Sequence, residues 1–225
     1  NYQVCAAAPN ASTCDTATLT VTAQSADMSA AFANVPSVVR PGQSLTGLSL
    51  TCTNSVTAAA AATSATCAPT ASVGTISAIT CTPAVGGSVA AGAAIVCSFN
   101  YTAPGTQGGA DETTTSVTFT GTTGAANDSV ASNNIVTTPA TMLDAVNDTA
   151  SAAGGLTGQS SNLASNDQFP AGSTFTLITA GTTCAAPTVS ATGTAGYTVP
   201  ASGSCLINYQ VCAAAPNAST CDTAT

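Results

Sequence analysis

The chain has 225 residues, and Ala, Thr and Ser account for 112 of them. Charge is nearly absent, with one basic residue (Arg40), nine acidic residues and no His. Nucleic-acid binding is excluded, because a protein needs several Lys or Arg side chains to displace counterions from phosphates. Acid–base and nucleophilic catalysis near neutral pH depend on His or a perturbed Lys, so we expect no enzyme. No apolar run approaches the roughly 18 residues of a membrane span.

The first 18 residues form one half of an internal repeat. They read NYQVCAAAPNASTCDTAT and recur letter for letter at 208–225, an offset of 207 residues. Identity of this length indicates one period of a tandem array together with a short overlap. Targeting and anchoring segments are then expected outside this stretch of sequence.

A short alternating segment, typical of a half-buried strand, follows the first copy and consists of Leu19, Thr20, Val21 and Thr22. The second copy reaches Thr225 ahead of the equivalent segment. We therefore predict that residues 1–25 complete the second unit of the preceding repeat, by covalent continuity or by strand donation between subunits. The alternative is that residues 1–24 fold back onto their own unit.

Similar alternating segments, separated by Gly, Pro, Asn and Ser, follow along the chain at 48–52, 95–101, 116–120, 175–177 and 205–212. Thr on a wet face and Val, Ile, Phe or Tyr on a dry face suit antiparallel sheets with one solvated side. The five-Ala run at 58–62 is too short for an independent helix, and we expect a loop or a single turn there. The pattern predicts an all-β protein built from β-sandwiches.

The chain has ten cysteines: Cys5, Cys14, Cys52, Cys67, Cys81, Cys97, Cys184, Cys205, Cys212 and Cys221. One period holds eight of them, because the first two are copies of the last two. Among the 105 possible connectivities, sequence proximity and strand parity favour 52–67, 81–97, 184–205 and 212–221. Parity places Cys52, Cys97 and Cys205 toward the core and Cys212 on the outer face. With no CxxC spacing and no His, disulfides are favoured over metal binding, and they indicate an oxidising, extracellular compartment.

Two stretches resemble bacterial surface modules. Cadherin-like Ig-type repeats of large adhesins are similar to the stretches at 144–149 (DAVNDT), 163–167 (LASND), 197–200 (YTVP) and 208–225. Residues 27–137, which close with NDSVASNNIV, resemble the Ig-like repeat called domain of unknown function eleven. The resemblances imply two Ig-like sandwiches per period, at 26–142 and 143–225, the second lacking its last strand. They also imply an extracellular or cell-surface protein that is not an enzyme.

Calcium is the one cofactor with support in the sequence. The candidate ligands are Asp144, Asn147, Asp148 and Asp167. Carboxylate and amide oxygens suit Ca²⁺, and an ion between units would stiffen an array. The alternative is that these residues are turn formers whose side chains bond to their own backbone.

Together these observations predict a structural protein that associates with itself into a polymer: the repeating unit of an extracellular filament, fibre or sheath. The alternative is a passive stalk of a giant cell-surface adhesin whose binding tip lies elsewhere. No receptor or ligand is indicated by the sequence.

Overall fold

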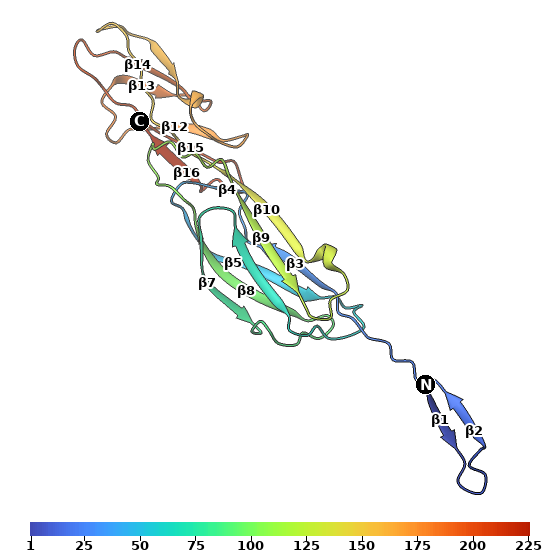
Figure 1. Ribbon diagram of the computed structural model, residues 1–225. Helices are drawn as coiled ribbons and strands as arrows, with labels where there is room; N and C mark the ends of the chain where they lie inside the picture. The colour runs from blue at the N-terminus through green and yellow to red at the C-terminus, as the bar shows by residue number, and fades with distance from the viewer.

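The computed structural model describes residues 1–225 as an elongated all-β molecule (Figure 1). Its helical content is two single turns of 3₁₀ helix, η1 (Ala131–Asn133) and η2 (Leu163–Ser165). No helix has the length and apolar character that crossing a bilayer requires. A separate hairpin, a first two-sheet unit and a second two-sheet unit follow one another in chain order from the N-terminus.

The first unit contains two four-stranded sheets. One has the order β3-β5-β8-β7 and the other β4-β10-β9-β6. All pairings are antiparallel except that of β4 with β10, which is parallel. The strands are β3 (Met28–Ala33), β4 (Val38–Val39), β5 (Ser44–Asn54), β6 (Thr66–Ala71), β7 (Thr75–Thr82), β8 (Ala94–Thr102), β9 (Ser116–Gly124) and β10 (Ile135–Met142).

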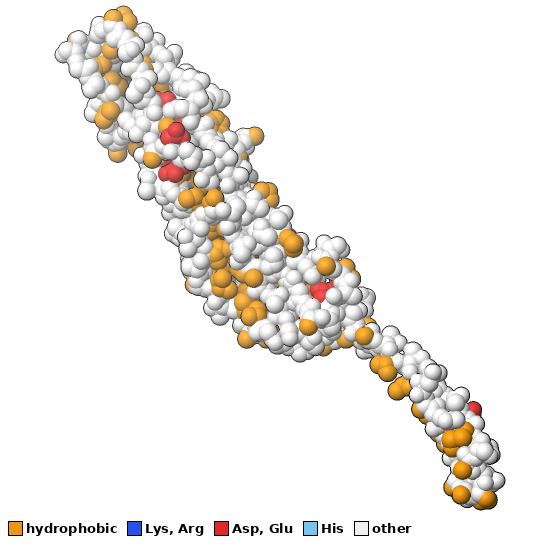
Figure 2. All heavy atoms as spheres, viewed as in Figure 1, with side chains coloured by type: hydrophobic (Ala, Val, Ile, Leu, Met, Phe, Trp, Pro, Cys, Tyr) orange, Lys and Arg blue, Asp and Glu red, His pale blue; other side chains and the backbone are white.

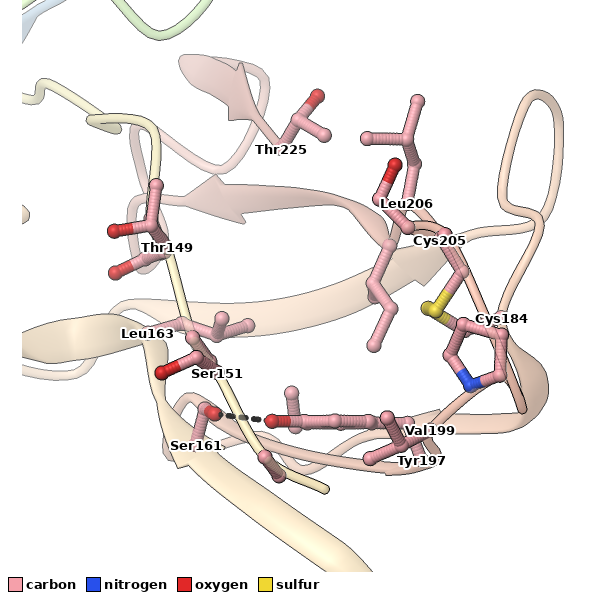
Figure 3. Close-up of a pocket in the computed structure, with 18 residues that line it drawn as sticks. Thr149, Ser151, Ser161, Leu163, Cys184, Tyr197, Val199, Cys205, Leu206 and Thr225 are labelled. Carbon is pink, nitrogen blue, oxygen red and sulfur yellow. Dashed lines mark hydrogen bonds between the residues drawn. A yellow bond between two sulfur atoms is a disulfide. The ribbon is translucent and has the colours of Figure 1, made fainter. Parts of the chain in front are cut away.

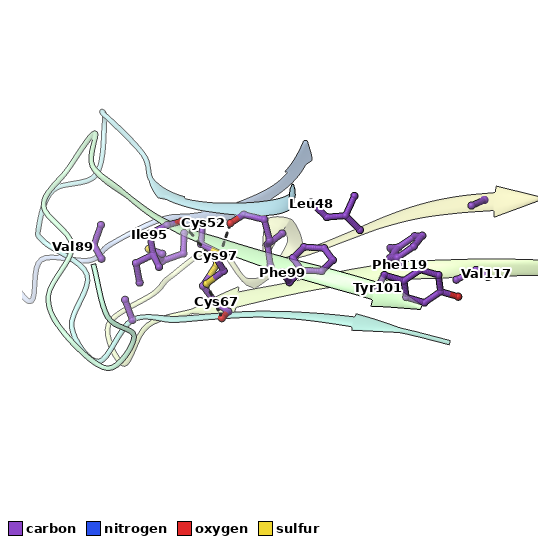
Figure 4. Packing of buried hydrophobic residues seen from close by; sticks show 14 of the residues in the cluster. Leu48, Cys52, Cys67, Val89, Ile95, Cys97, Phe99, Tyr101, Val117 and Phe119 are labelled. Carbon is purple, nitrogen blue, oxygen red and sulfur yellow. Dashed lines mark hydrogen bonds between the residues drawn. A yellow bond between two sulfur atoms is a disulfide. The ribbon is translucent and has the colours of Figure 1, made fainter. Parts of the chain in front are cut away.

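Strand alternation builds the core of this unit. Along β8 the buried residues are Ile95, Cys97, Phe99 and Tyr101, and the residues between them are exposed or partly exposed. They pack with inward residues of both sheets in one cluster of 19 buried residues (Figure 4). Tyr101 packs edge-on against Phe119 of β9, with ring centroids 4.9 Å apart. This side-chain packing joins the two sheets.

The second unit is smaller and has two three-stranded sheets, β11-β14-β13 and β12-β15-β16, all antiparallel. Its core is a cluster of 10 buried residues that includes Leu163, Phe175 and Tyr209. The strands are β11 (Gln159–Asn162), β12 (Thr174–Ile178), β13 (Ala185–Val189), β14 (Thr194–Thr198), β15 (Asn208–Cys212) and β16 (Cys221–Ala224).

The first copy of the repeat forms a hairpin of its own, from β1 (Tyr2–Cys5) and β2 (Cys14–Ala17). It lies at the end of the molecule opposite the second unit, and an extended segment joins it to the first unit (Figure 1). Every residue of both strands is exposed. Residues 1–24 therefore do not fold back onto their own unit in this structure.

Four of the five disulfides confirm the predicted pairings 52–67, 81–97, 184–205 and 212–221. The fifth, 5–14, repeats the last of these in the first copy. Cys52 and Cys97 are fully buried, as parity predicts, and Cys212 is partly exposed. Cys205 differs from its prediction, because it is partly exposed and lies outside any strand. The predicted strand 205–212 begins only at Asn208, where its pairing with Ile178 of β12 begins, and β16 pairs no further back than Tyr209.

Candidate functional site

The second copy of the repeat is built into the second unit. β15 pairs with β12 on one edge and with β16 on the other. Tyr209 and Val211 are 0% exposed, and Asp222 and Ala224 are buried on the same face of the sheet. Tyr209 stacks on Phe175 of β12, with ring centroids 6.1 Å apart. This copy therefore supplies a large part of the second unit's core.

The packed copy also contacts the first unit. Asn217 Nδ2 donates a hydrogen bond to Ser37 Oγ at 2.9 Å, and Gln107 Nε2 donates to the Cys221 carbonyl at 3.4 Å. Asp222 Oδ2 accepts from the Ala145 N–H at 3.0 Å, where the chain enters the second unit. The hairpin thus lies at the junction of the two units.

The first copy has the same sequence and an opposite environment. Tyr2 is 57% exposed and Val4 is 64% exposed, although their counterparts Tyr209 and Val211 are fully buried. The register is unchanged, with Tyr2 opposite Ala17 as Tyr209 is opposite Ala224. The hairpin's shape is therefore set locally, and its burial depends on whether a strand such as β12 lies beside it.

The segment after the first copy is also uncovered. Leu19 is 73% exposed and Val21 is 82% exposed, and residues 18–25 belong to no strand. An unpaired segment with aliphatic side chains at alternate positions can add as a strand to a sheet that has a free edge. The structure brings the predicted inter-unit strand to one end of the molecule and leaves it without a partner there.

A groove of about 300 Å³ opens in the second unit beside Thr225 (Figure 3). Its walls are the chain segments 148–152 and 203–207, and Tyr197 and Val199 of the β14 region lie across it. The Tyr197 hydroxyl and Ser161 Oγ are 2.9 Å apart within it. The groove is mainly apolar, with Leu163, Ala195 and Ile207 also in its lining.

Acidic residues gather where the two units meet (Figure 2). The Tyr209 hydroxyl lies 2.9 Å from Asp148 Oδ2 and 3.1 Å from both carboxylate oxygens of Asp167. The hydroxyl has one proton and can donate it to only one of the two carboxylates. This arrangement therefore favours a second proton, carried by one of the two carboxyl groups. Burial raises the pKa of both carboxyls and also those of Asp144 and Asp222.

The four predicted calcium ligands are engaged in separate contacts. Asp144 Oδ2 accepts from the Glu112 N–H, Asn147 Oδ1 accepts from the Thr225 N–H, and Asp148 and Asp167 meet at the Tyr209 hydroxyl. No group of three or more His, Cys, Asp or Glu side chains is arranged to hold a metal ion. The arrangement does not fit a single calcium site, and calcium binding stays a prediction of the sequence alone.

Acidification from pH 7 to pH 5 is expected to stabilise the protein. Burial raises the pKa of Asp167 from 3.8 to about 6 in the folded state. The folded chain then binds more protons than the unfolded chain between about pH 4 and pH 6, so the free energy of unfolding falls as pH rises through that window. Since Asp167 is partly exposed, we expect a change of about 1–2 kcal/mol.

Urea unfolding at pH 5, 6 and 7 measures this change. Asp167→Asn is the matched control, because its amide oxygen can still accept from the Val146 N–H that now bonds Asp167 Oδ1 at 2.7 Å. The control is expected to weaken the pH dependence. A wild-type protein more stable at pH 7 than at pH 5 would contradict the prediction.

Comparison with protein-family models, with curated proteins and with solved structures finds no match for this chain.

Sequence reasoning missed two features of this region. Asp222 was not singled out, although it shares strand parity with Ala224 and is 0% exposed. The groove was missed as well, because its walls come from segments about 50 residues apart in the chain. A signal for Asp222 exists in the alternation of the second copy, but none exists for the groove.

Proposed function

We propose that the chain is the repeating structural unit of an extracellular filament, fibre or sheath, with successive repeats joined through the 18-residue hairpin. One observation carries the proposal: a single sequence occurs twice, packed at one end of the molecule and uncovered at the other. The packed copy is part of the core of its unit, so the uncovered copy, which has the same sequence, can take the same position in a preceding repeat.

Overlaying the first copy of one repeat on the second copy of the previous one gives a continuous chain. Thr225 takes the place of Thr18, and the next residue is the equivalent of Leu19. Each repeat then contributes two Ig-like β-sandwiches in line. Contacts of this head-to-tail kind do not close into a ring unless the rotation between units allows it, so they extend into filaments.

The chemistry of the chain suits an extracellular structural role. Charged residues make up 4% of the sequence. Arg40 is its one Lys or Arg and is followed by Pro41, so trypsin-like proteases, which cut poorly before Pro, find almost no cleavage site. Little of the packing depends on surface ion pairs, which salt would screen. Five disulfides require an oxidising environment to form and persist, and they crosslink a core rich in small side chains.

Electron microscopy of a chain carrying three consecutive 207-residue periods tests the proposal. We expect straight rods about three times as long as the single-period protein, associating laterally with helical order. The single-period chain, imaged at the same concentration, is the control for length. Isolated flexible beads with no lateral order would overturn the filament proposal and favour the passive stalk of an adhesin.

A further inference from the structure

We infer that the groove beside Thr225 is the docking site for residues 19–22 of the following copy of the repeat. Those residues enter it as a direct continuation of β16. The inference rests on the proposed joining of repeats and adds the acceptor site, the register and the side chains that would be buried.

The register follows from the pairing of β15 with β16. Tyr209 lies opposite Ala224, so extension by one step sets Asn208 opposite Thr225. One further step places Leu19 of the next copy opposite Ile207, and two more place its Val21 opposite Cys205. The groove wall at 203–207 is the stretch that this extension reaches.

The backbone of that wall has free groups at the required positions. The backbone carbonyl of Leu206 bonds toward the β12 side, because it accepts from the Thr183 and Cys184 N–H groups. Cys205 and Ile207 make no backbone hydrogen bond in the structure. In an antiparallel ladder alternate residues bond to the same neighbour, and here Ala213 bonds to Thr220 on the β16 side. Cys205 and Ile207 continue that series and face the groove.

Side-chain parity places the aliphatic residues inside. Asp222 and Ala224 of β16 are buried, and Thr223 between them is partly exposed. Leu19 and Val21 fall two and four positions after Ala224 in the joined sequence, so both would point into the unit. They would meet Leu163, Tyr197, Val199 and Ile207, which line the groove (Figure 3). Thr20 and Thr22 would face solvent.

The first unit offers a precedent within the same chain. Its strand β10 has eight residues, pairs antiparallel with β9, and at its end pairs parallel with β4. β16 has four residues, and just past it the Asp148 N–H already donates to the Thr225 carbonyl at 2.9 Å. A longer β16 would run between 203–207 and 148–152 as β10 runs between β9 and β4.

Docking would also shorten the connection between repeats. With residues 19–22 in the groove, only Ala23, Gln24 and Ser25 separate the second unit from Ala26, which is fully buried in the next first unit. A three-residue connection restricts the rotation of one repeat against the next. The groove therefore also accounts for how a chain of small units could be stiff.

The test extends the full chain past Thr225 by the six residues LTVTAQ, copied from 19–24. The matched control adds TLTVAQ, which has the same composition but shifts the aliphatic residues by one position and so to the solvent face. We expect LTVTAQ to slow amide hydrogen exchange at Cys205 and Ile207 at least tenfold, and to raise the thermal midpoint of unfolding. TLTVAQ is expected to do neither.

Equal protection by both extensions, or protection by neither, would overturn the inference. The outcome is independent of the filament experiment. If the three-period chain forms filaments but LTVTAQ gives no protection, the proposed function stands and the docking of residues 19–22 in the groove is contradicted. If LTVTAQ gives protection but the three-period chain forms no filaments, the groove is a docking site for this segment and the filament proposal is contradicted.

Discussion

Tyr209→Ala is expected to lower the free energy of unfolding of the second unit by about 3–5 kcal/mol, the range for removing a large aromatic side chain from a core. Tyr209 is fully buried, and its ring stacks on Phe175. Its hydroxyl also reaches Asp148 and Asp167. Truncation would leave a cavity and two partly exposed carboxyls without their shared donor. Urea unfolding followed by circular dichroism measures the loss.

The chain supplies an unusually close control, Tyr2→Ala. This residue occupies the same position of the same 18-residue sequence, but it is 57% exposed. In the isolated single-period chain we expect a change within about 0.5 kcal/mol, as for surface substitutions. Tyr209→Phe separates the two contributions and should cost about 1–3 kcal/mol for the lost hydrogen bonds. Equal effects at positions 2 and 209 would contradict the burial difference.

Removing the disulfide between Cys52 and Cys67 by a double Ala substitution is expected to lower the free energy of unfolding of the first unit by about 3 kcal/mol. The cysteines are 15 residues apart, and crosslinking a loop of this length restricts the unfolded chain by that amount in the entropic description. Both side chains also lie in the main core cluster, so their sulfur atoms contribute packing that Ala does not replace.

Loss of the Cys5–Cys14 disulfide is the control. That crosslink lies in the uncovered hairpin, which shares neither core cluster. The double Ala substitution at these positions should leave the unfolding of both units unchanged in the single-period chain. A loss as large as that from removing the 52–67 crosslink would show that the first hairpin is coupled to a unit, against the structure.

Much of the fold could be predicted from local sequence patterns. Alternation predicted β5, β8, β9 and β12, because the two faces of a strand in a one-sided sheet differ in polarity. The same parity, with short separations, predicted the four disulfides of one period. Parity failed at Cys205, where the pattern of a strand is present but the neighbour that would pair with it is not.

The sequence by itself determined that this is a crosslinked all-β chain containing one exact repeat, since composition, alternation and identity are properties of the order of residues. It could not determine which copy of the repeat is buried, because the two copies are the same in every letter. Only the tertiary structure decided that, by setting β12 beside Asn208–Cys212 and nothing beside Tyr2–Cys5. The physical reason is that a hairpin's hydrogen bonds are local, whereas burial of its apolar face requires a surface contributed by distant residues.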